Sequence, residues 1–117
     1  MDPATGGSTD CLFCRIVAKE IPAAVVHEDE HVLAFRDIAP QAPLHVLVVP
    51  KRHVARVADI ADAGLAGRLL IAAAAIAKAE GRADFRLVVN DGAAAGQSVA
   101  HVHVHVLAGR PFSWPPG

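Results

Sequence analysis

The spacing of apolar positions predicts one long helix, and capping and stop residues predict a second, shorter one. Five apolar residues follow one another at spacings of four and three: Leu65, Leu69, Ala72, Ile76 and Ala79. This spacing places them on one helix face. Either Asp59 or Asp62 can cap the start of this helix, and Gly81 is placed to end it. A shorter helix fits residues 11–20, with Asp10 as its N-cap.

Short apolar runs bounded by turn residues predict five strands, at 23–27, 32–36, 45–49, 86–89 and 99–107. The polar stretch 28–30 joins the first two as a hairpin, and the closing segment 111–117 holds too many prolines to be regular. Apart from the long helix, the connections are short turns. We therefore expect an α+β domain in which both helices pack on one face of an antiparallel sheet.

Composition and charge narrow the class of protein. The chain has 117 residues, 53% of them hydrophobic and 20% charged, which fits one folded domain and excludes disorder. A formal net charge of −1 excludes binding to nucleic acid through a basic field. The longest uninterrupted apolar run, 69–77, is too short to span a membrane. Residues 1–10 lack the apolar core of a secretory signal, so we expect a flexible lead-in and a cytoplasmic protein. With only 4% aromatic residues the core is thin, and a partner subunit would add buried surface.

Three of the seven histidines alternate with valines in the segment HVHVHV, as His101, His103 and His105. Because strand side chains alternate between faces, the valines point into the core and the histidines point the other way. A merely solvated face is better served by Ser, Thr, Lys or Glu. Two functional interpretations remain, namely a metal bound by the row or an imidazole nucleophile assisted by its neighbours. A straight row on one strand surrounds a metal poorly, which favours the nucleophile.

Two further motifs carry chemistry. The loop 92–98, GAAAGQS, has small side chains that let backbone N–H groups approach an anion, although an ordinary hairpin turn explains it equally well. The pair Cys11 and Cys14, spaced C-x-x-C, fits half of a four-ligand metal site. Two small buried residues without a metal are the alternative. A redox motif is disfavoured because no βαβ unit surrounds the pair.

These motifs together resemble the histidine-triad (HIT) family, in particular its Hint-type nucleotide-binding branch. The signature HVHVHVL is accompanied by CLFCRIVAKEIPA, VLAFRDIAPQAPLHVLVVPKRH, VVNDG with GQS, and a closing WPPG, so the resemblance covers residues 11–117. It implies one HIT domain over 11–117 with a five-stranded antiparallel sheet and two helices. It also implies a homodimer whose sheets join, acting as a hydrolase of purine nucleoside 5′-phosphoramidates or related adenylates.

The resemblance also implies residue roles. His103 would attack the α-phosphorus and become nucleotidylated, His105 would contact the phosphate and the departing group, and His101 and His45 would support them. The nucleotide would contact His103, His105 and eight further residues: Phe13, Phe35, Asp37, Ile38, Asn90, Gly96, Gln97 and Ser98. No cofactor is required for this catalysis.

In some relatives with the cysteine pair, a structural zinc also uses two histidines, which correspond here to His53 and His101 beside Cys11 and Cys14. The chain departs from the branch at residues 93–95, at Ala100 and at Leu44, which leaves the preferred leaving group open. Two other functions compete with the hydrolase. One is a nucleotide-sensing dimer without required turnover, and the other is a hydrolase that uses a metal held by the histidine row.

Overall fold

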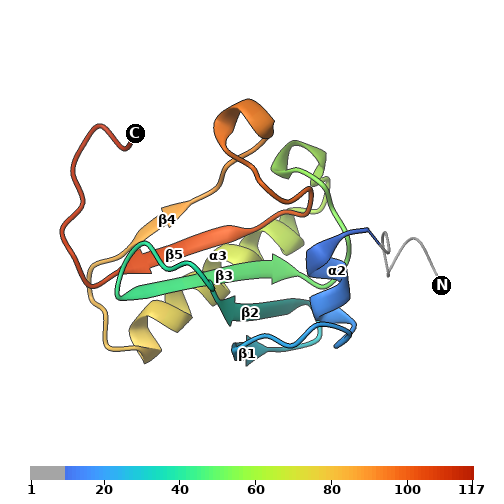
Figure 1. Ribbon diagram of the computed structural model, residues 1–117, viewed down its shortest axis with the longest axis horizontal. Coiled ribbons are helices and arrows are strands. Elements are labelled where there is room, and N and C mark those ends of the chain that lie inside the picture. The colour runs from blue at the N-terminus through green and yellow to red at the C-terminus, as the bar shows by residue number, and fades with distance from the viewer. Residues whose placement is uncertain (1–9) are drawn as a thin grey trace.

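The chain folds around one five-stranded antiparallel sheet with the order β1-β2-β3-β5-β4 (Figure 1). Its strands are β1 (Val25–Glu28), β2 (Val32–Arg36), β3 (Leu44–Pro50), β4 (Arg86–Val88) and β5 (Val104–Ala108). The computed structural model describes residues 10–117, so residues 1–9 of the expected flexible segment lie outside the described residues. The expected five-stranded α+β fold with two helices is confirmed.

The long helix α3 (Ala63–Ala79) begins and ends close to where its sequence predicts. Of the two candidate caps, Asp62 is the one used, because its carboxylate accepts the Gly64 N–H at 2.8 Å. Asp59 instead closes the short 3₁₀ turn η1 (Val57–Asp59). Gly81 follows the helix with a φ of 75°, where glycine is favoured. Within residues 10–117, no helix combines the length and the apolar character needed to cross a membrane.

The two helices cover opposite faces of the sheet, so the expectation that both pack on one face is wrong. The residues beneath α3 include Val32, Ala34 and Val46, whereas the short helix α2 (Leu12–Val17) packs with Leu33 and Phe35. Figure 1 shows α3 behind the strands. The physical reason is visible in β3, which is buried at every position and therefore needs cover on both faces.

Helix α2 is shorter than the predicted 11–20. Its N-cap is Cys11 rather than Asp10, because the Cys11 sulfur accepts the Cys14 N–H at 3.3 Å. The helix stops at its sixth residue, and Lys19 then takes a left-handed φ of 66° that ends any continuation. The predicted last strand, 99–107, is also shortened at its start. It begins only after His103, since the Val102 N–H bonds to the Val54 carbonyl in a loop and the His101 N–H bonds to the Val99 carbonyl in its own segment.

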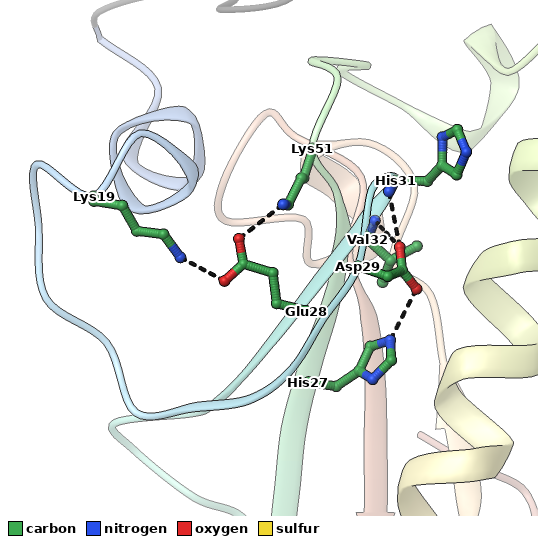
Figure 2. A network of polar contacts seen from close by, with 7 residues as sticks. All are labelled: Lys19, His27, Glu28, Asp29, His31, Val32 and Lys51. Carbon is green, nitrogen blue, oxygen red and sulfur yellow. Dashed lines mark hydrogen bonds and ion pairs between the residues drawn. The ribbon is translucent and has the colours of Figure 1, made fainter.

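A network of charged side chains ties the end of α2 and the end of β3 to the hairpin between β1 and β2 (Figure 2). Glu28 accepts from Lys19 and from Lys51, each at 2.7 Å, and these two ammonium groups hold the pKa of Glu28 at about 2. Asp29 accepts the backbone N–H groups of His31 and Val32 at 2.8 and 2.9 Å, which closes the hairpin turn. The network therefore links the segment after α2 to the hairpin, while the packing of α2 on the sheet comes from its buried apolar residues.

Candidate active site and metal centre

The three histidines of the 101–106 segment lie on the face of the sheet that α2 covers. The ring of Phe13, from the first turn of α2, meets the rings of His101 and His103 edge-on at centroid distances of 5.9 and 5.1 Å. The three valines between and after them belong to the core beneath α3. The expected alternation is therefore confirmed, although only His105 lies within β5. His101 is fully buried and His103 is 4% exposed.

The surroundings of His103 fix which of its nitrogens carries the proton. Its Nδ1 lies 2.7 Å from the backbone carbonyl oxygen of His101. A carbonyl oxygen can only accept, so Nδ1 must donate and must carry the hydrogen. The neutral imidazole then has its lone pair on Nε2. The arrangement therefore leaves the lone pair of the neutral ring on Nε2, the state in which an imidazole can act as a nucleophile.

His45, on β3, and His105, on β5, form a second hydrogen-bonded unit beside it. The Gln41 backbone N–H donates to Nδ1 of His45 at 3.0 Å, so the His45 proton lies on Nε2. That Nε2 is 2.9 Å from Nδ1 of His105 and 3.4 Å from a carboxylate oxygen of Asp37. When Nδ1 of His105 accepts this hydrogen, neutral His105 carries its own proton on Nε2.

Burial keeps this pair uncharged in the ligand-free chain. Burial, together with the repulsion that His103 and His45 exert when they are protonated, lowers the pKa of His105 to about 4. Burial also lowers the pKa of His45, against the opposing effect of the Asp37 carboxylate. At neutral pH both imidazoles are therefore hydrogen-bonding groups without charge. An anion that enters the site would reverse this preference, because it stabilises the charged form.

The aromatic residues expected at the nucleotide site form the apolar side of the same region. Phe13 and Phe35 meet edge-on at 5.5 Å, and both are 4% exposed. They belong to the core cluster beneath α2, so packing alone accounts for their burial. Ile38 differs, because its side chain is fully exposed in the loop after β2. Ile38 directly follows Asp37, whose carboxylate lies 3.4 Å from Nε2 of His45.

The loop 92–98 differs in detail from the expected anion cradle. The amide of Gln97 is used within the protein, since it donates to the carbonyls of Ala55 and Val99 at 2.7 and 3.0 Å and accepts the Gly92 N–H at 2.8 Å. The backbone N–H groups of residues 95–97 also bond inside the loop. The Gln97 side chain therefore stabilises the conformation of this loop. Among the described residues no hydrogen bond occupies the exposed Ser98 side chain, which leaves its hydroxyl available to an anion.

Two glycines let this loop bend at the site. Gly96 has a φ of 99°, and a Cβ there would lie 3.7 Å from the side chain of Asn90, another of the expected nucleotide contacts. Gly92 has a φ of 100° and lies against the guanidinium of Arg56. That guanidinium pairs with Asp91 at 3.2 Å.

Several supporting groups could not be found from the sequence alone. The Gln41 N–H and the carbonyls of His101 and Pro50 act through the backbone, so residue identity carries no signal of them. The Arg56–Asp91 pair joins positions far apart in the chain, so the sequence does not predict it. The turn residues Asp91 and Gly92 indicate only that a loop begins there.

The four residues expected to bind a metal converge at the edge of this site. Their ligand atoms all lie within 4.8 Å of one another. Nδ1 of His101 is 3.3 Å from the Cys11 sulfur, 3.5 Å from the Cys14 sulfur and 3.2 Å from Nδ1 of His53. The Cys14 sulfur is 3.1 Å from Nδ1 of His53.

This cluster fits a tetrahedral zinc ion. Zinc bonds of about 2.0 Å to nitrogen and about 2.3 Å to sulfur give tetrahedral edges of about 3.3 to 3.8 Å, close to the observed separations. Nε2 of His101 is 2.8 Å from the Pro50 carbonyl oxygen, so it carries the proton and leaves Nδ1 as a lone pair facing the cluster. Burial also lowers the pKa of His101 to about 4, which keeps that lone pair available.

Comparison with known proteins places the chain in a family. The HIT domain family matches residues 18–112, so the chain belongs to that family and the resemblance is confirmed. The adenylylsulfatase HINT1 of Arabidopsis thaliana is 47% identical over 119 residues, which cover 97% of this chain and 81% of that protein. The 14 kDa zinc-binding protein of Brassica juncea is 48% identical over 113 residues, covering 92% of this chain and 100% of that protein.

The fold agrees with solved structures of the family. The crystal structure of a HIT family hydrolase from Legionella pneumophila Philadelphia 1 superposes with a TM-score of 0.89 at 50% sequence identity. The match covers 92% of this chain and 100% of the Legionella chain.

Proposed function

We propose that the protein is a nucleotide hydrolase that cleaves purine nucleoside 5′-phosphoramidates, or related adenylates, through a nucleotidyl group held on His103. The observation that carries this proposal is the hydrogen bond from Nδ1 of His103 to the His101 carbonyl, which leaves the lone pair of the neutral ring on Nε2. Membership of a family with hydrolase members supports the reaction class. The adenylylsulfatase name of one relative supports an adenylyl group as the part transferred.

In the first half of the reaction, Nε2 of His103 forms a bond to the α-phosphorus while the bond from phosphorus to the leaving nitrogen breaks. The departing amine takes the bonding electron pair and needs a proton. His105 supplies that proton from Nε2, because the anionic phosphate favours its charged form. His45, through the 2.9 Å contact, holds His105 in the required orientation.

In the second half, water attacks the same phosphorus and the bond to His103 breaks. Its electron pair returns to Nε2, and His105 accepts the proton that water loses. The sum of the two steps is a nucleoside monophosphate and a free amine. The covalent intermediate replaces one difficult displacement by two easier ones.

The remaining expected contacts divide by chemistry. The Asp37 carboxylate, partly exposed beside His45, accepts from the ribose hydroxyls. Phe13, Phe35 and Ile38 give the purine its apolar surroundings. The phosphate lies against Asn90, Ser98 and the loop 92–98, in which Gly96 supplies the positive φ and Gln97 holds the shape through its hydrogen bond to Ala55.

We propose a structural zinc ion at Cys11, Cys14, His53 and His101. Four protein ligands close the coordination sphere, so the ion supplies a cross-link between α2 and the sheet rather than a position for substrate. Catalysis itself needs no cofactor. We also propose a homodimer, because within residues 10–117 β4 pairs on one side only and leaves an open edge close to the exposed side chain of Val89.

The decisive test is covalent trapping. Wild-type protein is mixed with adenosine 5′-phosphoramidate, quenched in alkali, where a phosphorus–nitrogen bond to histidine survives, and weighed by mass spectrometry. We expect one adenylyl group per chain, located on His103, and the H103A variant should carry none and lose turnover by several powers of ten. H31A, which removes an exposed histidine on the hairpin, is the matched control and should behave as wild type.

Two outcomes separate this proposal from its competitors. Full turnover by H103A would refute the covalent mechanism. In a C11S/C14S variant, which lacks the cysteine ligands of the proposed zinc site, turnover that is lost on chelation and restored by added metal would instead favour a metal held by the histidine row. A nucleotide-sensing dimer without required turnover predicts tight binding of the nucleotide with no adenylylated protein.

A further inference from the structure

His101 makes three connections at once, and together they join the metal centre to the nucleophile. Its Nδ1 faces the two cysteine sulfurs and His53 at 3.2 to 3.5 Å. Its Nε2 donates to the Pro50 carbonyl at 2.8 Å, and its own carbonyl accepts from Nδ1 of His103 at 2.7 Å. The residue is fully buried, so it cannot shift without moving these partners.

The carbonyl of His101 is the group that decides the tautomer of His103. An imidazole can place its single proton on either nitrogen, and the hydrogen bond at one nitrogen sets the choice. If that carbonyl rotates away, the proton can move to Nε2, where it blocks the lone pair that attacks phosphorus. The usefulness of His103 therefore depends on the backbone position of a residue in the metal centre.

A second connection runs through α2. Phe13 stands between the two cysteines in the sequence, and its ring edge contacts His103 at a centroid distance of 5.1 Å. The helix has only six residues, which is too short to be stable without tertiary anchors. Holding both cysteine sulfurs at one point therefore also holds the ring that packs on the nucleophile.

We infer that the Cys11, Cys14, His53 and His101 centre is a positioning device for the nucleophile: filling it with a metal holds His103 in the tautomer that reacts. This inference rests on the proposed function for its kinetic consequence only. The relation between metal and tautomer is a separate claim that can be measured without substrate.

The experiment compares the zinc-loaded chain, the metal-free chain and the C14S variant by two readouts. Nitrogen-15 NMR of the histidine rings reports the tautomer of His103 directly, without substrate. Rapid-quench kinetics report the rate of nucleotidyl transfer from adenosine 5′-phosphoramidate. We expect the zinc-loaded chain to hold His103 with its proton on Nδ1. In the other two samples the proton should be shared with Nε2, and transfer should slow by roughly ten- to a hundredfold, as when a supporting contact of a metal ligand is lost.

The control must separate positioning from simple loss of stability. D62A removes the N-cap of α3, on the opposite face of the sheet, and lowers the melting temperature without touching the site. We expect D62A to keep the wild-type tautomer and rate. If D62A, tested well below its melting temperature, loses as much of either readout as metal removal does, the inference is overturned.

A second comparison replaces zinc by cadmium, so that the inference can still be tested if the metal-free chain does not fold. Cadmium forms longer bonds to thiolates than zinc, so the cadmium-loaded chain keeps its cross-link with a displaced His101. We expect shifted ring resonances for His103 and slower transfer. Identical resonances and identical rates in the zinc and cadmium forms would overturn the inference. If the tautomer responds to the metal but no nucleotidyl transfer occurs in any form, the proposed function fails and the positioning claim stands.

Discussion

Binding of a nucleotide should draw a proton onto His105. In the ligand-free chain the pKa of this residue is about 4, so the imidazole is neutral above about pH 5. The groups that face it are His45, His103 and, through His45, the Asp37 carboxylate. None of these makes the charged form favourable at neutral pH. A phosphate that reaches Nε2 of His105 adds the missing negative charge.

The size of the effect follows from the charges. One negative charge at about 4 Å, with an effective dielectric constant of about 20, favours the imidazolium by about 4 kcal/mol. At 1.36 kcal/mol per unit this raises the pKa by about 3, to about 7. At about pH 5.5 the protonated fraction of His105 should rise from about 0.03 to about 0.97, so binding takes up about 0.9 proton. The linked affinity should be about 30-fold tighter at about pH 5.5 than at about pH 8.

The assay is isothermal titration calorimetry with the methyl ester of AMP, a phosphodiester whose single charge does not titrate in this range. Repeating the titration in buffers of different ionisation enthalpy gives the number of protons taken up. H105N should abolish the uptake and flatten the pH dependence, while H31A should leave both unchanged. The reasoning is refuted if wild-type protein takes up no proton at about pH 5.5, or if H105N takes up as much as wild type.

Three other predictions concern stability and assembly. The folded pKa of Glu28, about 2, lies below its usual value of 4.5, so its ion pairs stabilise the fold above about pH 4.5 and are lost as the pH falls toward 2. In urea denaturation, the free energy of unfolding should therefore change less between neutral pH and about pH 3 for E28Q than for wild type. Zinc at about 100 times its dissociation constant should stabilise the chain by about 2.7 kcal/mol, or about 11 °C in melting temperature for 117 residues, and C14S should lose this rise. Sedimentation should give twice the mass of one chain, and V89K, which puts a charge beside the open edge of β4, should give one.

Much of the fold was predictable because it follows from local patterns. The α3 face, its Asp62 cap and its Gly81 end all come from short-range rules that the structure obeys. The covering of both sheet faces was missed, although the unbroken apolar run 46–49 carried that signal. The start of α2 was predicted wrongly because the sulfur of Cys11, a weak hydrogen-bond acceptor, caps the helix. Aspartate is a preferred N-cap residue, so the sequence favoured Asp10 instead.

The candidate site was predictable only as far as side-chain identity reaches. The alternation of the histidines and valines follows from strand geometry, and the metal cluster follows from the family resemblance. The spacing of Cys11 and Cys14 alone could not select His53 and His101 as partners. The hydrogen bonds from the Gln97 amide to backbone carbonyls were not predicted, because an amide in a glycine-rich loop can equally well contact a ligand or stabilise the loop itself.

The alternation in HVHVHV serves the core and the site together, and this limits how the site can vary. The valines are packed beneath α3, so a slip of one residue would move all three imidazoles into that core and all three valines toward α2. With the register fixed, each histidine meets a different environment by its distance along the segment. His101 reaches the cysteine cluster, His103 reaches the carbonyl two residues behind it, and His105 reaches His45 on β3. Three identical side chains at one period therefore acquire three different sets of partners, with the proton on Nδ1 of His103 and on Nε2 of His101 and His105. This difference suits the proposed roles of His103 as nucleophile, His101 as its positioning residue and His105 as proton donor.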